Sequence, residues 1–224
     1  MKNSTYLIIL LALGLVFTSY KWVTSSTSSS SSESDSTSSA VNASIENIMT
    51  RTSVRAYTDR VVEKATVDTL LHAAMAAPTA GNKQPWRFVV VEDRATLDSI
   101  SANFKSMTMA KEAALAVIMC GEPAATFPGE GVGYWIQDVS AASENLLLAA
   151  HAIGLGAVWC GIYPMSDRVA KFSQMLNLPS GITPMACICI GYPSGETTPK
   201  DKWTPEYIHY NTWDNSWTPS TDNE

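Results

Sequence analysis

A loop of small residues and amides in the first half of the chain has the composition of a ligand-binding loop. It reads Ala77-Pro78-Thr79-Ala80-Gly81-Asn82-Lys83-Gln84-Pro85-Trp86-Arg87-Phe88. A helical, Ala- and Leu-rich run leads into it, and the apolar β-type run Phe88–Val91 follows. Glycine lets a backbone approach a ligand closely, and amide side chains both donate and accept hydrogen bonds. The loop can therefore lay backbone N–H groups and amides against a flat polar ligand.

A second segment, Arg51-Thr52-Ser53-Val54-Arg55, places two cations and two hydroxyls within five residues. In an extended segment alternate side chains share a face, so Arg51, Ser53 and Arg55 would point together. Guanidinium groups and a hydroxyl suit a phosphate. Taken alone, the pattern is also typical of a solvated surface turn. Lys200-Asp201-Lys202 adds two cations far downstream, and these matter only if the fold brings them to the first segment.

The common catalytic fingerprints are missing from the sequence. Gly129-x-Gly131-x-Gly133 has the wrong spacing for a dinucleotide-binding loop, and there is no Walker A loop, Gly-x-Ser-x-Gly elbow or His-Glu-x-x-His motif. His72 and His151 lie in Ala/Leu-rich helical runs, which favours packing or surface roles. The role of His209 stays open.

The cysteines indicate packing rather than metal binding. Cys187 and Cys189 alternate within an apolar strand, and no pair has metal-ligand spacing with nearby histidines. We therefore predict no metal site. A disulfide is possible in an oxidising compartment, but the sequence gives no pairing.

Composition limits the class of partner. The chain has 224 residues and a net charge of −6, with neither a basic run nor an arginine-rich helix. Nucleic acid is therefore not an expected partner. In an acidic protein, local cations are needed to hold a phosphate, which draws attention to the few that are present.

The N-terminus resembles a targeting segment. Lys2 is followed by an apolar run from Tyr6 to Phe17, which is short for a membrane span and fits a secretory signal peptide. An uncleaved anchor extended through Trp22 is the alternative. The Ser/Thr-rich stretch Ser25–Ser39 has no apolar residue to bury, so it reads as a flexible tether. We expect an extracytoplasmic (periplasmic or secreted) or membrane-anchored protein.

We divide the chain accordingly. Residues 1–23 are a signal peptide or membrane anchor, 24–43 a disordered linker, 44–213 one folded domain, and 214–224 a flexible tail.

Hydrophobic periodicity predicts interleaved helices and strands within this domain. The predicted helices are Ile45–Thr50, Glu63–Ala77, Arg94–Asn103, Met107–Glu112, Tyr134–Ile153 and Asp167–Leu176. The predicted strands are Trp86–Val91, Ala114–Cys120, Ala157–Cys160 and Thr183–Tyr192. Gly121–Gly133 is predicted to be a loop. The elements do not alternate strictly, so we expect an α+β domain with helices flanking a mixed central sheet.

Five motifs together resemble one known family. They are Arg51-x-Ser53-x-Arg55, the loop Ala77–Trp86, Trp135-x-x-Asp138 with Glu144–Ala150, Gly154–Gly161, and Ile190-Gly191-Tyr192-Pro193. They occur in the order seen in the nitroreductase family, and the resemblance covers roughly Ser44 to Trp213. It implies a nitroreductase-like FMN-binding fold that is completed by homodimerisation, with two FMN sites at the subunit interface. The long apolar helix from Tyr134 would form part of the dimer core.

The resemblance also implies roles for individual residues. Arg51, Ser53, Lys200 and Lys202 would hold the FMN phosphate, and Arg55 would approach the N1/O2 edge of the flavin ring. Pro78, Thr79 and Asn82 would come from the other protomer and line the ring and ribityl chain. Trp159, Cys160 and Gly161 would pack at the central edge of the ring and offer backbone N–H groups near N5. The candidate cofactor-binding set is completed by Thr52, Ala80 and Gln84.

The implied activity is reduction of nitroaromatics, quinones or similar acceptors by ping-pong electron transfer, with NAD(P)H as the donor and no side-chain acid or base required. Three alternatives stay open: a non-enzymatic flavin-binding or flavin-sequestering protein, a deiodinase-like reductive dehalogenase, and a tethered structural module without flavin. The segment Phe104–Tyr134 is short for the substrate-covering lid of the deiodinases. Cys160 beside the ring would tune, react, or simply fill apolar space.

Overall fold

The computed structural model describes residues 42–216. The chain divides into two units, 1–49 and 50–224. What is described of the first is helical, in a helix over residues 42–50. The predicted signal peptide or anchor and most of the Ser/Thr-rich linker lie outside the described residues. Within 42–216, no helix is both long enough and apolar enough to cross a membrane.

The second unit is built on four strands. They are β1 (Trp86–Val91), β2 (Leu115–Gly121), β3 (Gly156–Gly161) and β4 (Thr183–Gly191). They form one sheet in the order β1-β2-β4-β3, and every neighbouring pair is antiparallel. A single parallel bridge joins Ser53 to Ala157 at the β3 edge, so the mixed character expected of the sheet is limited to that bridge. The predicted α+β class is confirmed.

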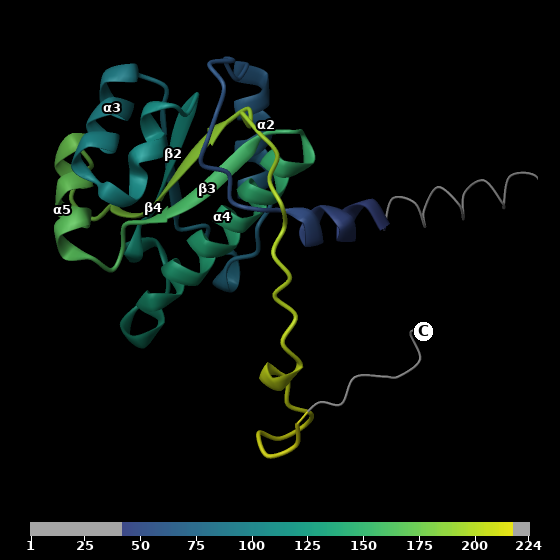
Figure 1. Cartoon of the computed structure of the whole chain (residues 1–224). Helices are drawn as coiled ribbons and strands as arrows, with labels where there is room; N and C mark the ends of the chain where they lie inside the picture. Colours follow the sequence, from purple (N-terminus) through teal and green to yellow (C-terminus); the bar gives the residue numbers. More distant parts are fainter. Residues whose placement is uncertain (1–41, 217–224) are drawn as a thin grey trace, which may run out of the picture. The chain divides into compact units, whose positions relative to one another are not determined.

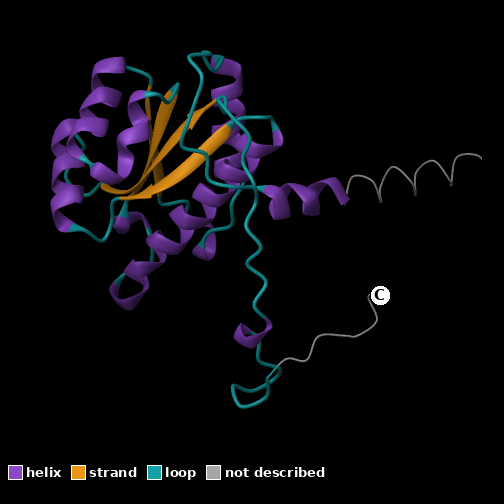
Figure 2. Cartoon of the chain, viewed as in Figure 1, coloured by secondary structure: helices purple, strands orange, loops and turns teal. Residues whose placement is uncertain are grey.

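Helices cover both faces of this sheet (Figure 1, Figure 2). The α-helices are α2 (Lys64–Met75), α3 (Arg94–Asn103), α4 (Tyr134–Ala152) and α5 (Ser166–Met175). Short 3-10 turns complete the unit: η1 (Ala80–Asn82), η2 (Lys105–Lys111), η3 (Pro123–Ala125), η4 (Gly129–Gly133) and η5 (Pro205–Tyr207). Each predicted helix and strand of this unit is present, with ends shifted by at most a few residues, although Met107–Glu112 is 3-10 rather than α.

Two hydrophobic cores lie on opposite faces of the sheet. One joins the sheet to α2 and α4 through residues such as Leu70, Leu146 and Ile188. The other joins it to α3, η2 and α5 and includes Leu97 and Phe172. Because β2 and β4 are buried along nearly their whole length, they read as continuous apolar runs rather than alternating ones.

After β4 the chain leaves the sheet and extends away from the helices (Figure 1). It ends in a turn in which the Tyr210 N–H donates to the Asn215 carbonyl at 2.7 Å and His209 pairs with Ser216. Several of its aromatic side chains are exposed, among them Trp203, Tyr207 and Trp213. Residues 214–216 therefore belong to this turn, and the rest of the predicted tail lies outside the described residues.

Candidate cofactor site

A cavity of about 200 Å³ brings the two predicted cation segments together. Its lining residues are Arg51, Thr52, Ser53, Arg55, Lys200 and Lys202. The lining thus holds four cations and two hydroxyls, and no carboxylate. In a protein of net charge −6, such a donor set fits an anion, and its geometry of forks, point charges and hydroxyls fits a phosphate.

The sheet edge fixes the first of these segments. The Val54 N–H donates to the Ala157 carbonyl at 3.0 Å, and Ser53 bridges to Ala157. The Val54 side chain is buried against Gly156, where a Cβ would come within 2.6 Å of it. With Val54 turned into the core, the hydrophilic residues on either side of it face the cavity.

Backbone pairing just after residues 51–55 explains why Lys200 and Lys202 line the same cavity. The Thr58 N–H donates to the Tyr192 carbonyl at 2.9 Å, and the Ser194 N–H donates to the Ala56 carbonyl at 3.1 Å. This antiparallel pairing runs the chain after β4 back along residues 51–55. Lys200 and Lys202 consequently lie beside Arg51 although about 150 residues separate them in sequence.

Tyr57 anchors the same stretch from inside the protein. Its hydroxyl lies 2.7 Å from the Val54 carbonyl and 3.0 Å from the Cys189 carbonyl, and its ring contacts Gly191. Burial is the main cause that raises the pKa of Tyr57 well above its ordinary value, so the hydroxyl stays a neutral donor. No motif in the sequence singles out this tyrosine.

One carboxylate orients Arg51 in the cavity wall. Arg51 Nε lies 3.5 Å from Glu144 Oε1 on α4, and the Arg51 side chain is only 16 % exposed. Because Glu144 is half exposed, solvent screens this ion pair and its own contribution to stability is small. Its effect is to direct the guanidinium.

The outer edge of β3 continues from this cavity. Since the Ala157 carbonyl bonds to Val54, residues 157, 159 and 161 turn their backbone groups away from β4. Trp159 and Gly161 therefore present N–H groups along this edge. The Cys160 N–H instead faces β4, so it is not among the outward groups. The Gly161 carbonyl accepts from Arg168 Nη1 at 2.6 Å.

The Cys160 side chain points into the second core. Its sulfur lies 3.7 Å from the Ser106 carbonyl oxygen and 4.0 Å from Met109 Sδ. A hydrogen bond with Cys189, followed by burial, raises the pKa of the Cys160 thiol far above its ordinary value. A neutral buried thiol is a poor nucleophile, which favours the packing interpretation. Within residues 42–216 no group of three or more His, Cys, Asp or Glu side chains could hold a metal ion.

The amide-rich loop lies apart from the cation cavity. Its candidate residues Pro78, Thr79, Ala80, Asn82 and Gln84 connect α2 to β1, and none of them lines that cavity. In the single chain the cation cavity and the amide-rich loop are therefore separate parts of the predicted site. This agrees with the expectation that the loop of one protomer completes the site of the other.

Hydrogen bonds shape this loop from within and from outside. Thr79 Oγ1 accepts from the Gln84 N–H at 3.2 Å, and Gln84 Nε2 donates to Asn82 Oδ1 at 3.0 Å. The Ala80 N–H donates to Asp138 Oδ1 on α4 at 2.9 Å, so this N–H is already engaged. Asp138 was missed as a site residue, although it belongs to the Trp135-x-x-Asp138 motif and that motif was a signal that could have found it.

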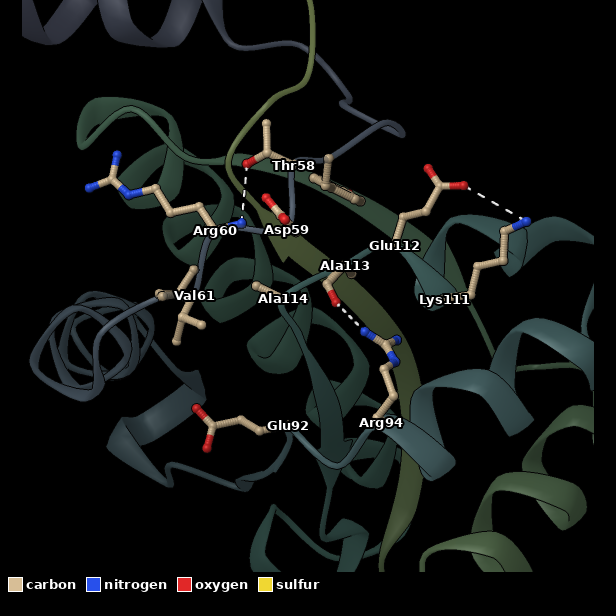
Figure 3. Close-up of a pocket in the computed structure, with 12 residues that line it drawn as sticks. Thr58, Asp59, Arg60, Val61, Glu92, Arg94, Lys111, Glu112, Ala113 and Ala114 are labelled. Atoms are coloured by element: carbon tan, nitrogen blue, oxygen red, sulfur yellow. Dashed lines mark hydrogen bonds and ion pairs between the residues drawn. The ribbon is translucent and has the colours of Figure 1, made fainter.

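A larger cavity, about 600 Å³, opens elsewhere and holds none of the predicted residues (Figure 3). Its lining mixes cations with carboxylates, and its three cations already have partners. Arg94 Nη1 donates to the Ala113 carbonyl at 3.1 Å, Lys111 pairs with Glu112 at 3.8 Å, and the Arg60 guanidinium lies over the Tyr192 ring. The smaller cavity has cations without carboxylates in its lining, so it is the better candidate for an anionic ligand.

Comparison with known proteins identifies the family. The sequence model of the Nitroreductase family matches residues 48–192, and the chain belongs to this family. It is 40 % identical over 169 residues to a protein of Methanothermobacter thermautotrophicus provisionally named NADH dehydrogenase/NAD(P)H nitroreductase, covering 75 % of this chain and 87 % of that protein.

Solved structures agree with this assignment. A Bacteroides thetaiotaomicron protein of the same provisional name has 43 % identity and a TM-score of 0.72, over 76 % of this chain and 98 % of that one. A provisionally named nitroreductase of Desulfovibrio desulfuricans, solved in complex with FMN, has 27 % identity and a TM-score of 0.65, over 76 % and 97 %. The predicted nitroreductase fold is thereby confirmed.

Proposed function

We propose that this protein is an FMN-dependent oxidoreductase that takes electrons from NAD(P)H and passes them to nitroaromatics, quinones or similar small acceptors in a ping-pong cycle. The observation that carries the proposal is the cavity in which Arg51, Ser53, Arg55 and Lys202 converge. The names of the relatives support it, since they include an FMN reductase (NADPH) of Bacillus subtilis and an NADPH nitroreductase of Salmonella typhimurium.

The residues present fit FMN. The phosphate would lie among the cations and hydroxyls of the cavity, where charge-assisted hydrogen bonds are stronger than neutral ones. When bound, FMN supplies the redox step by accepting a hydride equivalent and releasing its electrons to the acceptor. Arg55 would stabilise the negative charge that reduction leaves at the N1/O2 edge. The outward N–H groups of Trp159 and Gly161 would meet the N5 side of the ring.

A homodimer is part of this proposal. Along α4, Ile136, Ala141 and Ala149 are apolar but only half-buried in the single chain. The exposed aromatics of the C-terminal segment, including Trp203 and Trp213, add apolar surface that a monomer would leave in water. A second copy would cover these surfaces and bring Thr79 and Asn82 to the cavity of its partner.

The proposal predicts both colour and turnover. Purified protein is expected to be yellow and to release FMN on denaturation. Under anaerobic conditions NADH or NADPH should bleach the visible absorbance of the flavin, and adding a nitroaromatic or a quinone should restore it. A colourless protein that takes up no FMN would contradict the proposal. A yellow protein that neither nucleotide bleaches would instead support the flavin-sequestering alternative.

A further inference from the structure

The amide-rich loop holds an unusual backbone conformation. Gly81, Asn82 and Gln84 have φ angles of +57°, +54° and +50°. This left-handed region is disfavoured for residues with a Cβ, and such residues persist where their surroundings fix them. The side chains of Asn82 and Gln84 are exposed, so the strain is maintained while these amides remain accessible to a ligand.

Two hydrogen bonds join residues Pro78–Gln84 of the loop to other parts of the described chain, and just after them the Glu122 N–H donates to the Pro85 carbonyl at 2.8 Å. At its end Arg87 Nη1 donates to the Gln84 carbonyl at 3.3 Å, in an exposed setting. At its start the Ala80 N–H donates to Asp138 Oδ1 at 2.9 Å. Asp138 is 5 % exposed, so water competes poorly for this bond, which makes it the stronger of the two ties.

Within the described residues, the Asp138 side chain has no hydrogen-bond partner other than the Ala80 N–H. Its second oxygen, Oδ2, is buried and has no hydrogen-bond partner there. Burying a carboxyl group in this way is costly, and a residue that served packing alone would be apolar. The single contact that its polarity provides is with the loop.

We propose that Asp138 is a positioning residue, which holds the Pro78–Gln84 loop in the conformation that receives FMN. This inference rests on the proposed function, because the loop is assigned to the flavin there. The inference adds that the loop already has its binding conformation before FMN binds. Binding then does not incur the entropic cost of ordering the loop.

The test compares the FMN affinity of variants by fluorescence titration of the apoprotein. Asp138→Ala should raise the FMN Kd about ten-fold, which corresponds to about 1.4 kcal/mol. Asp138→Asn keeps an acceptor at Oδ1 and loses no hydrogen bond at Oδ2, so its Kd should stay within about two-fold of wild type. Failure of Asn to rescue, or an unchanged Kd in Asp138→Ala, would overturn the inference.

Asn145→Ala is the matched control. Asn145 also lies on α4 and also makes a side-chain bond to the backbone, from Nδ2 to the Ala73 carbonyl at 3.0 Å, but its partner belongs to α2. This variant should lose stability while keeping its FMN Kd within about two-fold. A loss of affinity equal to that of Asp138→Ala would mean that any damage to α4 weakens FMN binding, and would overturn the specific role.

Two further measurements decide the matter if Asp138→Ala does not fold. Ala80→Pro removes the donor from the other side; Thr79, at φ −135° and ψ 153°, already has the extended backbone that precedes proline. It should weaken FMN binding about as much as the loss of Asp138.

In wild-type apoprotein the Ala80 amide should exchange slowly with solvent, and exchange at the rate of an unstructured amide would contradict the inference. Wild-type protein that binds no FMN would instead refute the proposed function.

Discussion

Replacing Arg51 and Lys202 together by alanine is expected to abolish stable retention of FMN. A charged hydrogen bond contributes about 1.5–3 kcal/mol, so Arg51→Ala alone should weaken FMN binding by that amount and the double variant by about 3 kcal/mol or more. This corresponds to a loss of a hundred-fold or more in affinity. Equilibrium titration of the apoprotein with FMN, at fixed ionic strength, measures the change.

Lys171→Ala provides the control for the loss of positive charge. Lys171 is exposed on α5 and does not line the cavity, so its removal should leave the FMN Kd unchanged. If the double variant retained FMN as tightly as wild type, the assignment of the cavity to the phosphate would be wrong.

A methyl group added at Gly156 is expected to disturb the cation cavity by displacing Val54, which lies between the cavity residues Ser53 and Arg55. A Cβ there would lie 2.6–2.9 Å from three atoms of the Val54 side chain, all of them close to the backbone. Overpacking of this kind costs about 1–3 kcal/mol. Because Val54 attaches residues 51–55 to β3, Gly156→Ala should lower both the free energy of unfolding and the affinity for FMN. Denaturant unfolding and FMN titration of the same preparation measure the two effects.

Gly133→Ala is the matched substitution. A Cβ at Gly133 would meet nothing within 4 Å, and its backbone has an ordinary right-handed conformation. This variant should match wild type in both measurements. A Gly156→Ala protein with unchanged stability and unchanged FMN affinity would show that the contact between Val54 and β3 does not hold the segment.

Much of the fold could be predicted because its elements carry strong local patterns. β1 and α3 have the predicted ends, and α4 ends within one residue of the expected position. Their runs are apolar or periodic along their whole length. The short turns η3 and η4 were hidden in the predicted loop Gly121–Gly133, because one turn of 3-10 helix contains too few residues for a period to show.

The site was predictable only in part, for a physical reason. Alternation in an extended segment placed Arg51, Ser53 and Arg55 on one face, and all three line the cavity. The arrival of Lys202 depends on the pairing of residues 56–58 with 192–194, a long-range contact with no local signal. Asp138 and Glu144 were noted only as parts of a motif. Their supporting roles could not be predicted, because their partners Ala80 and Arg51 are distant in sequence and the fold alone brings them together.

We propose that cations from two distant segments, 51–55 and 200–202, bind the terminal phosphate of FMN. Comparing the affinities of FMN and riboflavin for the same apoprotein tests it most directly, because the two ligands differ only in that phosphate. FMN is expected to bind at least about a hundred-fold more tightly than riboflavin, in line with two charged hydrogen bonds to the phosphate. Equal affinity for FMN and riboflavin would contradict it.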